Sequence, residues 1–338
     1  MDHALGTPPD LPAGWTARPP DLADLPRLLE LRSADRLHFT GSGRVDRDAV
    51  ENEIAGSSSW TRQQLVALDD ADVVRAWAAV HDRAAGRAMV HLYVDRSSPV
   101  AAQAAAGLYA WMEERAGAIA HMRGLEGTQL DASPFAEDAE QRAWLDAAGY
   151  VKTRTWLQMT RPVERSEATS LPAPREGVAP RTVRTHANGM PVAGDLQLVH
   201  RMLEESFADH FNSYRESFPE FVTRLREHPG HRWDHWWLAY VDGHPAGALV
   251  GSVLPAGASG VEGTYVEYIG VSRRARGRGV AKALLHSVIA EAASRGRDRV
   301  GLEVDADSPT GADQLYSSMG WHTDYVTESW HKDIAAPR

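Results

Sequence analysis

Apolar positions in the second half of the chain change from strand-like to helix-like spacing. Two short apolar runs, residues 236–241 and 246–250, flank a polar stretch with Gly243 at its turn, which is typical of a β-hairpin. A third apolar run, residues 266–271, precedes an alanine-rich segment with helical periodicity, residues 280–293. These patterns predict hairpin strands followed by a strand and a long helix.

The first half of the chain has the same order of segments. Its predicted hairpin, strand, helix and following strand are residues 64–80, 90–94, 100–116 and 125–130. Each half also ends on a similar motif, because residues 144–150 align with residues 315–321. We therefore predict an α/β protein with two tandem copies of one unit, each a mixed, mostly antiparallel sheet flanked by helices on both faces.

A polar, proline-containing stretch separates the two halves. It contains Pro162, Pro172, Pro174 and Pro180 among charged and hydroxyl residues, a composition typical of an exposed connection. The predicted division is a first domain at residues 1–163, a linker at 164–180 and a second domain at 181–338.

Composition and charge narrow the function. The chain has 338 residues, 43% of them hydrophobic, without an apolar run long enough to cross a bilayer. Residues 1–6 lack the basic and apolar segments of a secretory signal, so we expect a cytoplasmic protein. The formal charge of −10 disfavours nucleic acid as a partner and favours a cationic one.

The residue inventory also limits the chemistry. The chain has no cysteine, which excludes disulfides, thiolate metal sites and a cysteine nucleophile. The closest histidine cluster, His228, His231 and His235, lacks the paired spacing of a metal site, so we expect no metal.

A loop between the predicted strand and the long helix has the features of an anion site. Residues 274–279 read Arg-Ala-Arg-Gly-Arg-Gly, and the N–H groups of such a loop and of the first helical turn point toward a bound anion. Glycines 277 and 279 allow close approach of a phosphate, and the arginines suit a diphosphate. Gly279 is followed by Val280 rather than by Lys-Ser/Thr, and position 282 is lysine rather than a third glycine, so neither a P-loop nor a dinucleotide loop fits.

This R-x-x-G-x-G loop resembles the acetyl-CoA loop of the GNAT N-acetyltransferase superfamily. The resemblance extends to the preceding hairpin, to the strand at residues 301–304 and to the motif Leu315-Tyr316-x-x-x-Gly320-Trp321. Two such units in one chain resemble the tandem GNAT proteins with a mycothiol-synthase-like architecture. The resemblance implies that acetyl-CoA is the acyl-donor substrate.

The same resemblance implies roles for individual residues. Tyr316 is expected to protonate the departing CoA thiolate, and residues 269–271 are expected to bind the pantetheine arm and the acetyl carbonyl where the sheet splays open. The expected CoA-binding residues are Ile269, Gly270, Val271, Arg274, Arg276, Gly277, Arg278, Gly279, Val280 and Ala281.

The base and the acceptor site are predicted from neighbouring residues. By strand alternation Glu267 faces the same side as residues 269 and 271, so it is the candidate base, acting directly or through a water; an ordinary solvated glutamate is the alternative. Asp209, His210 and Asp305 are candidates for binding a cationic acceptor.

The first half lacks the matching chemistry. Its loop, residues 95–100, has no glycine and contains Pro99, and Leu145 stands where the second half has Tyr316. We therefore expect the first domain to be inactive.

The resulting prediction is an N-acetyltransferase, a monomer or homodimer, that acts on a primary amine of a small cationic metabolite such as an amino sugar, an antibiotic or an amino-acid derivative. Direct transfer is expected because no cysteine can carry the acyl group. Three alternatives stay open: a mycothiol-synthase-like reaction on a cysteinyl pseudodisaccharide, acetylation of protein tails, and a non-catalytic acyl-CoA-binding sensor or partner module.

Overall fold

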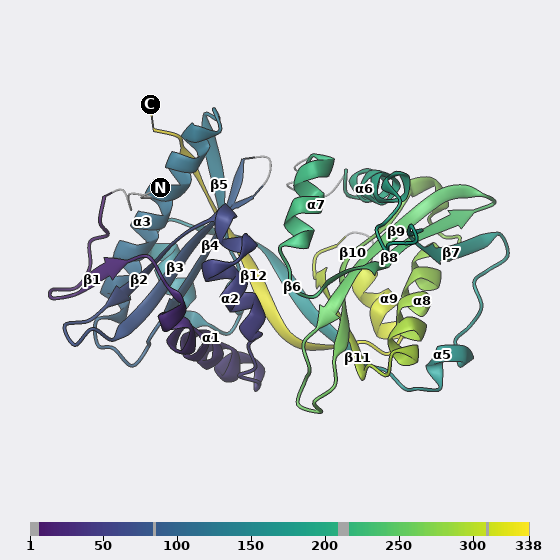
Figure 1. The fold of residues 1–338 in the computed structure, drawn as a ribbon, viewed down its shortest axis with the longest axis horizontal. Helices are drawn as coiled ribbons and strands as arrows, with labels where there is room; N and C mark the ends of the chain where they lie inside the picture. Colours follow the sequence, from purple (N-terminus) through teal and green to yellow (C-terminus); the bar gives the residue numbers. More distant parts are fainter. Residues whose placement is uncertain (1–6, 84–85, 209–215, 309–310, 338) are drawn as a thin grey trace. The chain divides into compact units, whose positions relative to one another are not determined.

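The chain forms two compact units, which are drawn in Figure 1. The computed structural model describes residues 7–83, 86–208, 216–308 and 311–337. The first unit comprises residues 1–157, 305–307 and 325–338, and the second comprises residues 158–304 and 308–324.

The first unit is built on a sheet with the strand order β1-β2-β3-β4-β5-β12-β6, to which β6 contributes its first half. Neighbouring strands from β1 to β12 run antiparallel except β4 and β5, which are parallel. The strands are β1 (Thr16–Arg18), β2 (Arg62–Leu68), β3 (Val74–Arg83), β4 (Arg87–Val94), β5 (Gly127–Ala132), β6 (Val151–Pro162) and β12 (His322–Ala335). The helices are η1 (Leu22–Asp24), α1 (Leu25–Thr40), α2 (Arg47–Ala55), η2 (Ser57–Thr61), α3 (Ala101–Met122) and α4 (Ala139–Ala147).

Alternation along the strands sends side chains into two separate cores. On β2, Leu65 and Ala67 pack into the core that contains α3, whereas Val66 and Leu68 pack with α1 and α2. The alanine-rich face of α3 lets this helix lie close to the sheet, because Ala104 and Ala105 are fully buried. Helices therefore cover both faces, as the sequence predicts.

The second unit repeats this plan. Its strand order is β6-β11-β10-β9-β8-β7, with the last part of β6 at one edge. The strands are β7 (Val178–Thr182), β8 (His231–Val241), β9 (His244–Leu254), β10 (Gly263–Val271) and β11 (Arg299–Asp305). The helices are α5 (Glu167–Ser170), α6 (Ala193–Phe207), α7 (Phe218–Arg226), η3 (Arg273–Ala275), α8 (Val280–Ser294) and α9 (Ala312–Ser318).

Two helical layers again cover the sheet of the second unit. On one face α6 and α7 pack on Trp236, Leu238 and Val250. On the other face α8 packs closely on the hairpin, because a Cβ on Gly247 would lie 3.0 Å from Val280 Cγ1. Trp236 of β8 is thus part of the core.

The division of the chain differs in two places from the predicted boundaries. The stretch predicted as a linker contains α5, which packs against α8 (Figure 1), and the start of β7, which pairs with β8. In addition, β12 lies near the end of the chain, yet it pairs with β5 of the first unit from Trp330 to Ala335. The first unit therefore includes a strand that sequence order assigns to the second. None of the described helices is both long enough and apolar enough to span a membrane.

Candidate active site

The parallel strands β10 and β11 separate partway along their length. Residues 264–266 of β10 pair with residues 300–302 of β11, and beyond them β10 continues beside β9 as far as Val271. Among the described residues, the β11-facing edge of residues 269–271 has no β11 partner in the register. Backbone N–H and C=O groups along such an edge can hydrogen-bond an extended ligand.

Helix α6 approaches the end of β10 closely. A Cβ on Gly270 would lie 2.8 Å from both Cβ and Oγ of Ser206 and 3.1 Å from Cδ2 of Leu203. Ser272, just after the strand, donates from Oγ to Oε1 of Glu205 at 2.7 Å. Glycine at position 270 thus allows the helix to pack directly on the strand end that is predicted to bind the acyl group.

A β-bulge changes the direction of the candidate base. The register with β9 shifts between Val266 and Tyr268, which leaves Glu267 as the additional residue. Glu267 and Tyr268 therefore lie on one face of the sheet, the one covered by α6 and α7, and Ile269 lies on the other. The expectation that Glu267 faces the same side as Ile269 and Val271 is wrong, because simple alternation does not account for the bulge.

A second carboxylate lies beside Glu267. Glu303 follows Leu302, the last residue of β11 that pairs with β10, and sequence reasoning did not single it out. Ser252 Oγ donates to Glu267 Oε1 at 2.6 Å, and Gln158 Nε2 donates to Glu303 Oε2 at 3.0 Å. In the part of the chain that the structure describes, no lysine, arginine or histidine forms an ion pair with either carboxylate.

The charge of Glu267 acts on the carboxyl group of Glu303. Desolvation of the carboxyl group raises the pKa of Glu303, the hydrogen bond from Gln158 opposes this shift, and the negative charge of Glu267 adds to it. The sequence did carry a signal for Glu303. Leu302 and Val304 are buried on one face of β11, so alternation places Glu303, which lies between them, on the other face of this strand.

The arginine-rich loop has the backbone geometry of an anion site. Gly277 and Gly279 have φ values of 76° and 87°, which are left-handed conformations that favour glycine. The N–H of Ala283 is bonded to the carbonyl of Gly279 at 3.0 Å, so the N–H groups of Val280 and Ala281 precede the hydrogen-bonded part of α8. These donors lie at the positive end of a 15-residue helix, where an anion is stabilised.

Positive side chains surround this loop. Arg274 and Arg276 are exposed, and Arg278 lies 3.1 Å from Asp242 in an exposed ion pair. Arg175 also reaches the loop, because its Nη1 donates to the carbonyl of Gly277 at 3.1 Å. Sequence reasoning missed Arg175, since it lies about a hundred residues away in a stretch that predicts only an exposed connection.

Tyr316 is a buried phenol on α9. Its side chain is 6% exposed, and its ring packs at 5.9 Å from that of Trp321. Burial raises the pKa of Tyr316 to about 12, so the hydroxyl keeps its proton at neutral pH. The hydroxyl makes no hydrogen bond to a residue that the structure describes, which leaves it available as a donor.

The matching loop of the first unit is closed by its own hydrogen bonds. The N–H of Ser97 donates to Oδ1 of Asp95, and the N–H of Ser98 donates to the Asp95 carbonyl, both at 3.1 Å. The N–H groups of Val100 and Ala101 donate to Ser98. The backbone N–H groups of this loop are therefore bonded within the loop itself and are not available to an anion, unlike those at the start of α8.

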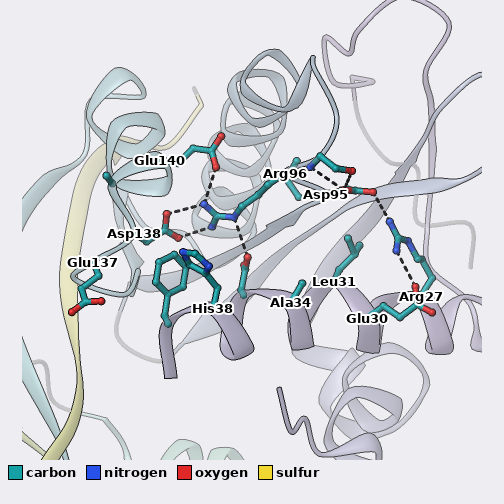
Figure 2. Close-up of a pocket in the computed structure, with 15 residues that line it drawn as sticks. Arg27, Glu30, Leu31, Ala34, His38, Asp95, Arg96, Glu137, Asp138 and Glu140 are labelled. Carbon is teal, nitrogen blue, oxygen red and sulfur yellow. Dashed lines mark hydrogen bonds and ion pairs between the residues drawn. The ribbon is translucent and has the colours of Figure 1, made fainter. Parts of the chain in front are cut away.

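An acidic pocket of about 610 Å³ lies beside this closed loop. Figure 2 shows Arg96 pointing toward Asp138 and Glu140, with which it forms hydrogen bonds of 2.5 to 3.0 Å. It also donates to Asp35 at 3.1 Å. The charged residues that line the pocket are Arg27, Glu30, Asp35, Asp95, Arg96, Glu137, Asp138 and Glu140. Carboxylates outnumber arginines, which disfavours the phosphates of CoA.

The phenol of Tyr316 also has no counterpart at the matching position of the first unit. Leu145, which aligns with Tyr316, is fully buried in the core formed with α3. Its side chain carries no proton to donate, and burial in the core gives it a packing role.

The predicted acceptor-binding residues have separate outcomes. Asp209 and His210 lie outside the described residues. Asp305 is 6% exposed, lies 3.4 Å from Nη1 of Arg154 and accepts a hydrogen bond from the N–H of Asp307 at 2.9 Å. The carboxylate of Asp305 thus already has an ion-pair partner and a hydrogen-bond donor within the first unit.

One member of the histidine cluster, His235, is part of a hydrogen-bonded network. His235 is 1% exposed, with Nδ1 2.7 Å from Oδ1 of Asp234 and Nε2 2.6 Å from Nη1 of Arg297. Burial lowers the pKa of His235 to about 4 from its ordinary 6.5; Asp234 opposes this shift, whereas Arg297 adds to it. Within the described ranges, no group of three or more His, Asp or Glu side chains is arranged to hold a metal ion.

Comparison with known proteins gives matches in the region of this site. Residues 199–321 match the model of the acetyltransferase (GNAT) family. The chain is 35% identical over 180 residues to the mycothiol acetyltransferase of Thermobispora bispora, a match that covers 51% of this chain and 55% of that protein. The chain therefore spans about half the length of that curated relative.

Two solved structures resemble the whole chain. A GCN5-related N-acetyltransferase from Sphaerobacter thermophilus has a TM-score of 0.74 and 24% identity, with 96% of this chain and 97% of that one covered. A tandem GNAT protein from the clavulanic acid biosynthesis pathway has a TM-score of 0.64 and 14% identity, with 96% and 99% covered. At these identities the likeness shows the fold, and it confirms the prediction of two tandem GNAT-like α/β units.

Proposed function

The chain contains a domain of the acetyltransferase (GNAT) family, and we propose that it transfers an acetyl group from acetyl-CoA to a primary amine of a small cationic metabolite. The observation that carries this proposal is the loop at residues 274–279. Its two glycines have left-handed backbone angles, and it opens onto the first turn of α8. A Cβ on Gly277 would meet nothing within 4 Å, so the space in front of the loop is open to a diphosphate.

The donor thioester fits the open end of β10. Backbone groups of residues 269–271 would hold the pantetheine arm in an extended conformation, because this strand edge is not paired with β11. The oxygen of the acetyl group would accept a hydrogen bond from the same segment, and this bond stabilises the negative charge that forms during attack.

The reaction requires three proton transfers in addition to the attack. Glu267 accepts a proton from the acceptor ammonium, and the free amine then attacks the thioester carbonyl carbon. The C–S bond breaks as the N–C bond forms, and Tyr316 donates its proton to the sulfur of the leaving CoA. The raised pKa of Tyr316, about 12, keeps the phenol protonated until this step. The second proton of the attacking nitrogen then passes through solvent to the Tyr316 phenolate, which restores the phenol and leaves the neutral amide.

The charge around Glu267 supports a cationic acceptor. Glu267 and Glu303 have no cationic partner among the described side chains, and each is hydrogen-bonded by a neutral donor. Two neighbouring carboxylates repel each other, and a bound cation relieves this repulsion. Amino sugars, aminoglycoside antibiotics and amino-acid derivatives carry the required ammonium groups.

Three other functions remain testable. The similarity to a mycothiol acetyltransferase supports a cysteinyl pseudodisaccharide as the acceptor. An acyl-CoA sensor would bind CoA at the loop without turnover, and an enzyme for protein tails would act on lysine peptides. We propose that the first unit is inactive in each case, because its loop donors are used internally and Leu145 replaces the acid.

The test is the release of free thiol from acetyl-CoA in the presence of an amine panel. The panel contains an amino sugar, an aminoglycoside, an amino-acid amide, a cysteinyl pseudodisaccharide and a lysine peptide. Turnover with a small amine supports the proposal, and the preferred amine identifies the class. Binding of CoA without turnover on any amine would indicate the sensor, and failure to bind CoA would refute the whole proposal.

A further inference from the structure

The segment that precedes β7 runs beside the first half of α8. It follows α5, which packs on α8, and the backbone of Pro172 interacts with His286 of that helix. On the far side, the carbonyl of Gly177 accepts a hydrogen bond from the N–H of Asp242 at 2.8 Å. The chain is therefore held on both sides of Arg175, and this side chain is directed to the start of α8.

Arg175 lies on the second glycine of the loop. A Cβ on Gly279 would lie 2.9 Å from Cδ and 3.2 Å from Nε of Arg175. The guanidinium uses one Nη1–H to donate to the carbonyl of Gly277. Because an arginine carries five N–H donors in a planar fork, most of its donors remain for a ligand in front of the loop.

This position is unfavourable for a cation unless an anion binds there. The N-terminus of a helix carries partial positive charge, which repels arginine and attracts negative groups. Arg175 forms no ion pair with a described carboxylate and lies against Gly277 and Gly279, whereas Arg278 between them in the chain is paired with Asp242. An exposed arginine held against like charge indicates a negatively charged partner.

We propose that Arg175 is a ligand of the diphosphate of acetyl-CoA. Its fork would add side-chain donors to the backbone N–H groups of Val280 and Ala281 at this anion site. The proposal rests on the proposed function for the identity of the ligand, but the prediction that an anion binds next to Arg175 can be tested separately. It assigns a binding role to a segment that precedes the family domain in the chain.

Calorimetry with CoA and with pantetheine, which lacks the phosphates, tests this role. We expect Arg175→Ala to weaken CoA binding about tenfold, the usual loss for one hydrogen bond to a charged group, and to leave pantetheine binding unchanged. Arg175→Lys should keep part of the affinity, because it retains the charge but not the fork. The KM for acetyl-CoA should rise about tenfold while kcat stays within about twofold, since Arg175 is far from the reacting atoms in the ligand.

Arg165→Ala is the matched control, because Arg165 is also exposed and lies in the same connecting stretch. We expect this variant to bind CoA as the wild type does. An equal loss in both variants, or CoA affinity in Arg175→Ala within twofold of wild type, would overturn the role of Arg175 while leaving the proposed function intact. If the wild type does not bind CoA, the proposed function fails, and inorganic pyrophosphate becomes the probe for the anion site. Tighter pyrophosphate binding by the wild type than by Arg175→Ala supports an anion site at Arg175. Equal pyrophosphate binding by the two proteins overturns it.

Discussion

Replacing Gly270 by alanine tests the close contact between α6 and the end of β10. The new Cβ would lie 2.8 Å from Cβ and Oγ of Ser206 and 3.1 Å from Cδ2 of Leu203. Carbon atoms pack best at about 3.5–4 Å, so the end of α6 must move away by up to about 1 Å. We expect the free energy of unfolding of the second unit to fall by about 1–3 kcal/mol, the usual cost of overpacking a core.

The same movement should affect the site. Glu205 on α6 accepts the hydrogen bond from Ser272, so a displaced helix weakens the link at the point where β10 leads into the arginine-rich loop. We therefore expect weaker CoA binding as well as lower stability. Urea unfolding followed by tryptophan fluorescence, together with calorimetry of CoA binding, measures the two effects.

A matched control and a rescue make the reasoning falsifiable. Gly194 lies in the first turn of α6, where a Cβ would meet nothing within 4 Å, so Gly194→Ala should be neutral or slightly stabilising. In the Gly270→Ala background, Ser206→Gly removes both close atoms and should recover part of the lost stability, whereas Ser206→Ala keeps the Cβ contact and should recover less. An unchanged urea midpoint in Gly270→Ala, or strictly additive effects in the double variants, would refute the steric argument.

Three further outcomes follow from the site and its surroundings. Tyr316→Phe should lower kcat about a hundredfold or more in the thiol-release assay, while calorimetry shows unchanged CoA affinity; an unchanged kcat would exclude Tyr316 as the acid. Glu303→Gln should raise the KM for a cationic acceptor about tenfold and leave the KM for acetyl-CoA unchanged, and an unchanged acceptor KM would contradict the proposed carboxylate pair. His235 is buried with a pKa of about 4, below its unfolded value of 6.5. Its contribution to the free energy of unfolding is therefore fully present above pH 6.5 and is lost as the pH falls to about 4. The loss amounts to about 3 kcal/mol of unfolding free energy. Urea unfolding at pH 7 and pH 4.5 should show a smaller acid-induced loss of stability in His235→Gln than in the wild type. An equal loss in both proteins would contradict this role of His235.

The elements and the loop could be predicted because their signals are local. The hairpin turn, the strand at β10 and the alanine-rich α8 follow one another within about 60 residues, and the glycines of the loop are needed for local backbone angles. The buried Tyr316 likewise follows from a short motif on one helix.

The remaining features depend on contacts between distant segments. The bulge at Glu267 is a property of pairing with β9, so alternation within β10 alone does not reveal it. Glu303 joins the site through the register of two strands that are separated by a helix. Arg175 reaches Gly277 from a stretch whose prolines and charges predict only a connection. Pairing partners of this kind are not encoded in the pattern of any single segment.

The pairing of β12 with β5 has a consequence for the order of folding during synthesis. The ribosome releases β5 long before β12, because the register joins Gly127 to Ala335. Until β12 emerges, the edge of β5 that receives it exposes backbone groups to any other strand nearby. The half that is made first therefore completes its sheet last, and a nascent chain that stalls in the second half carries an open strand edge with which another chain can pair.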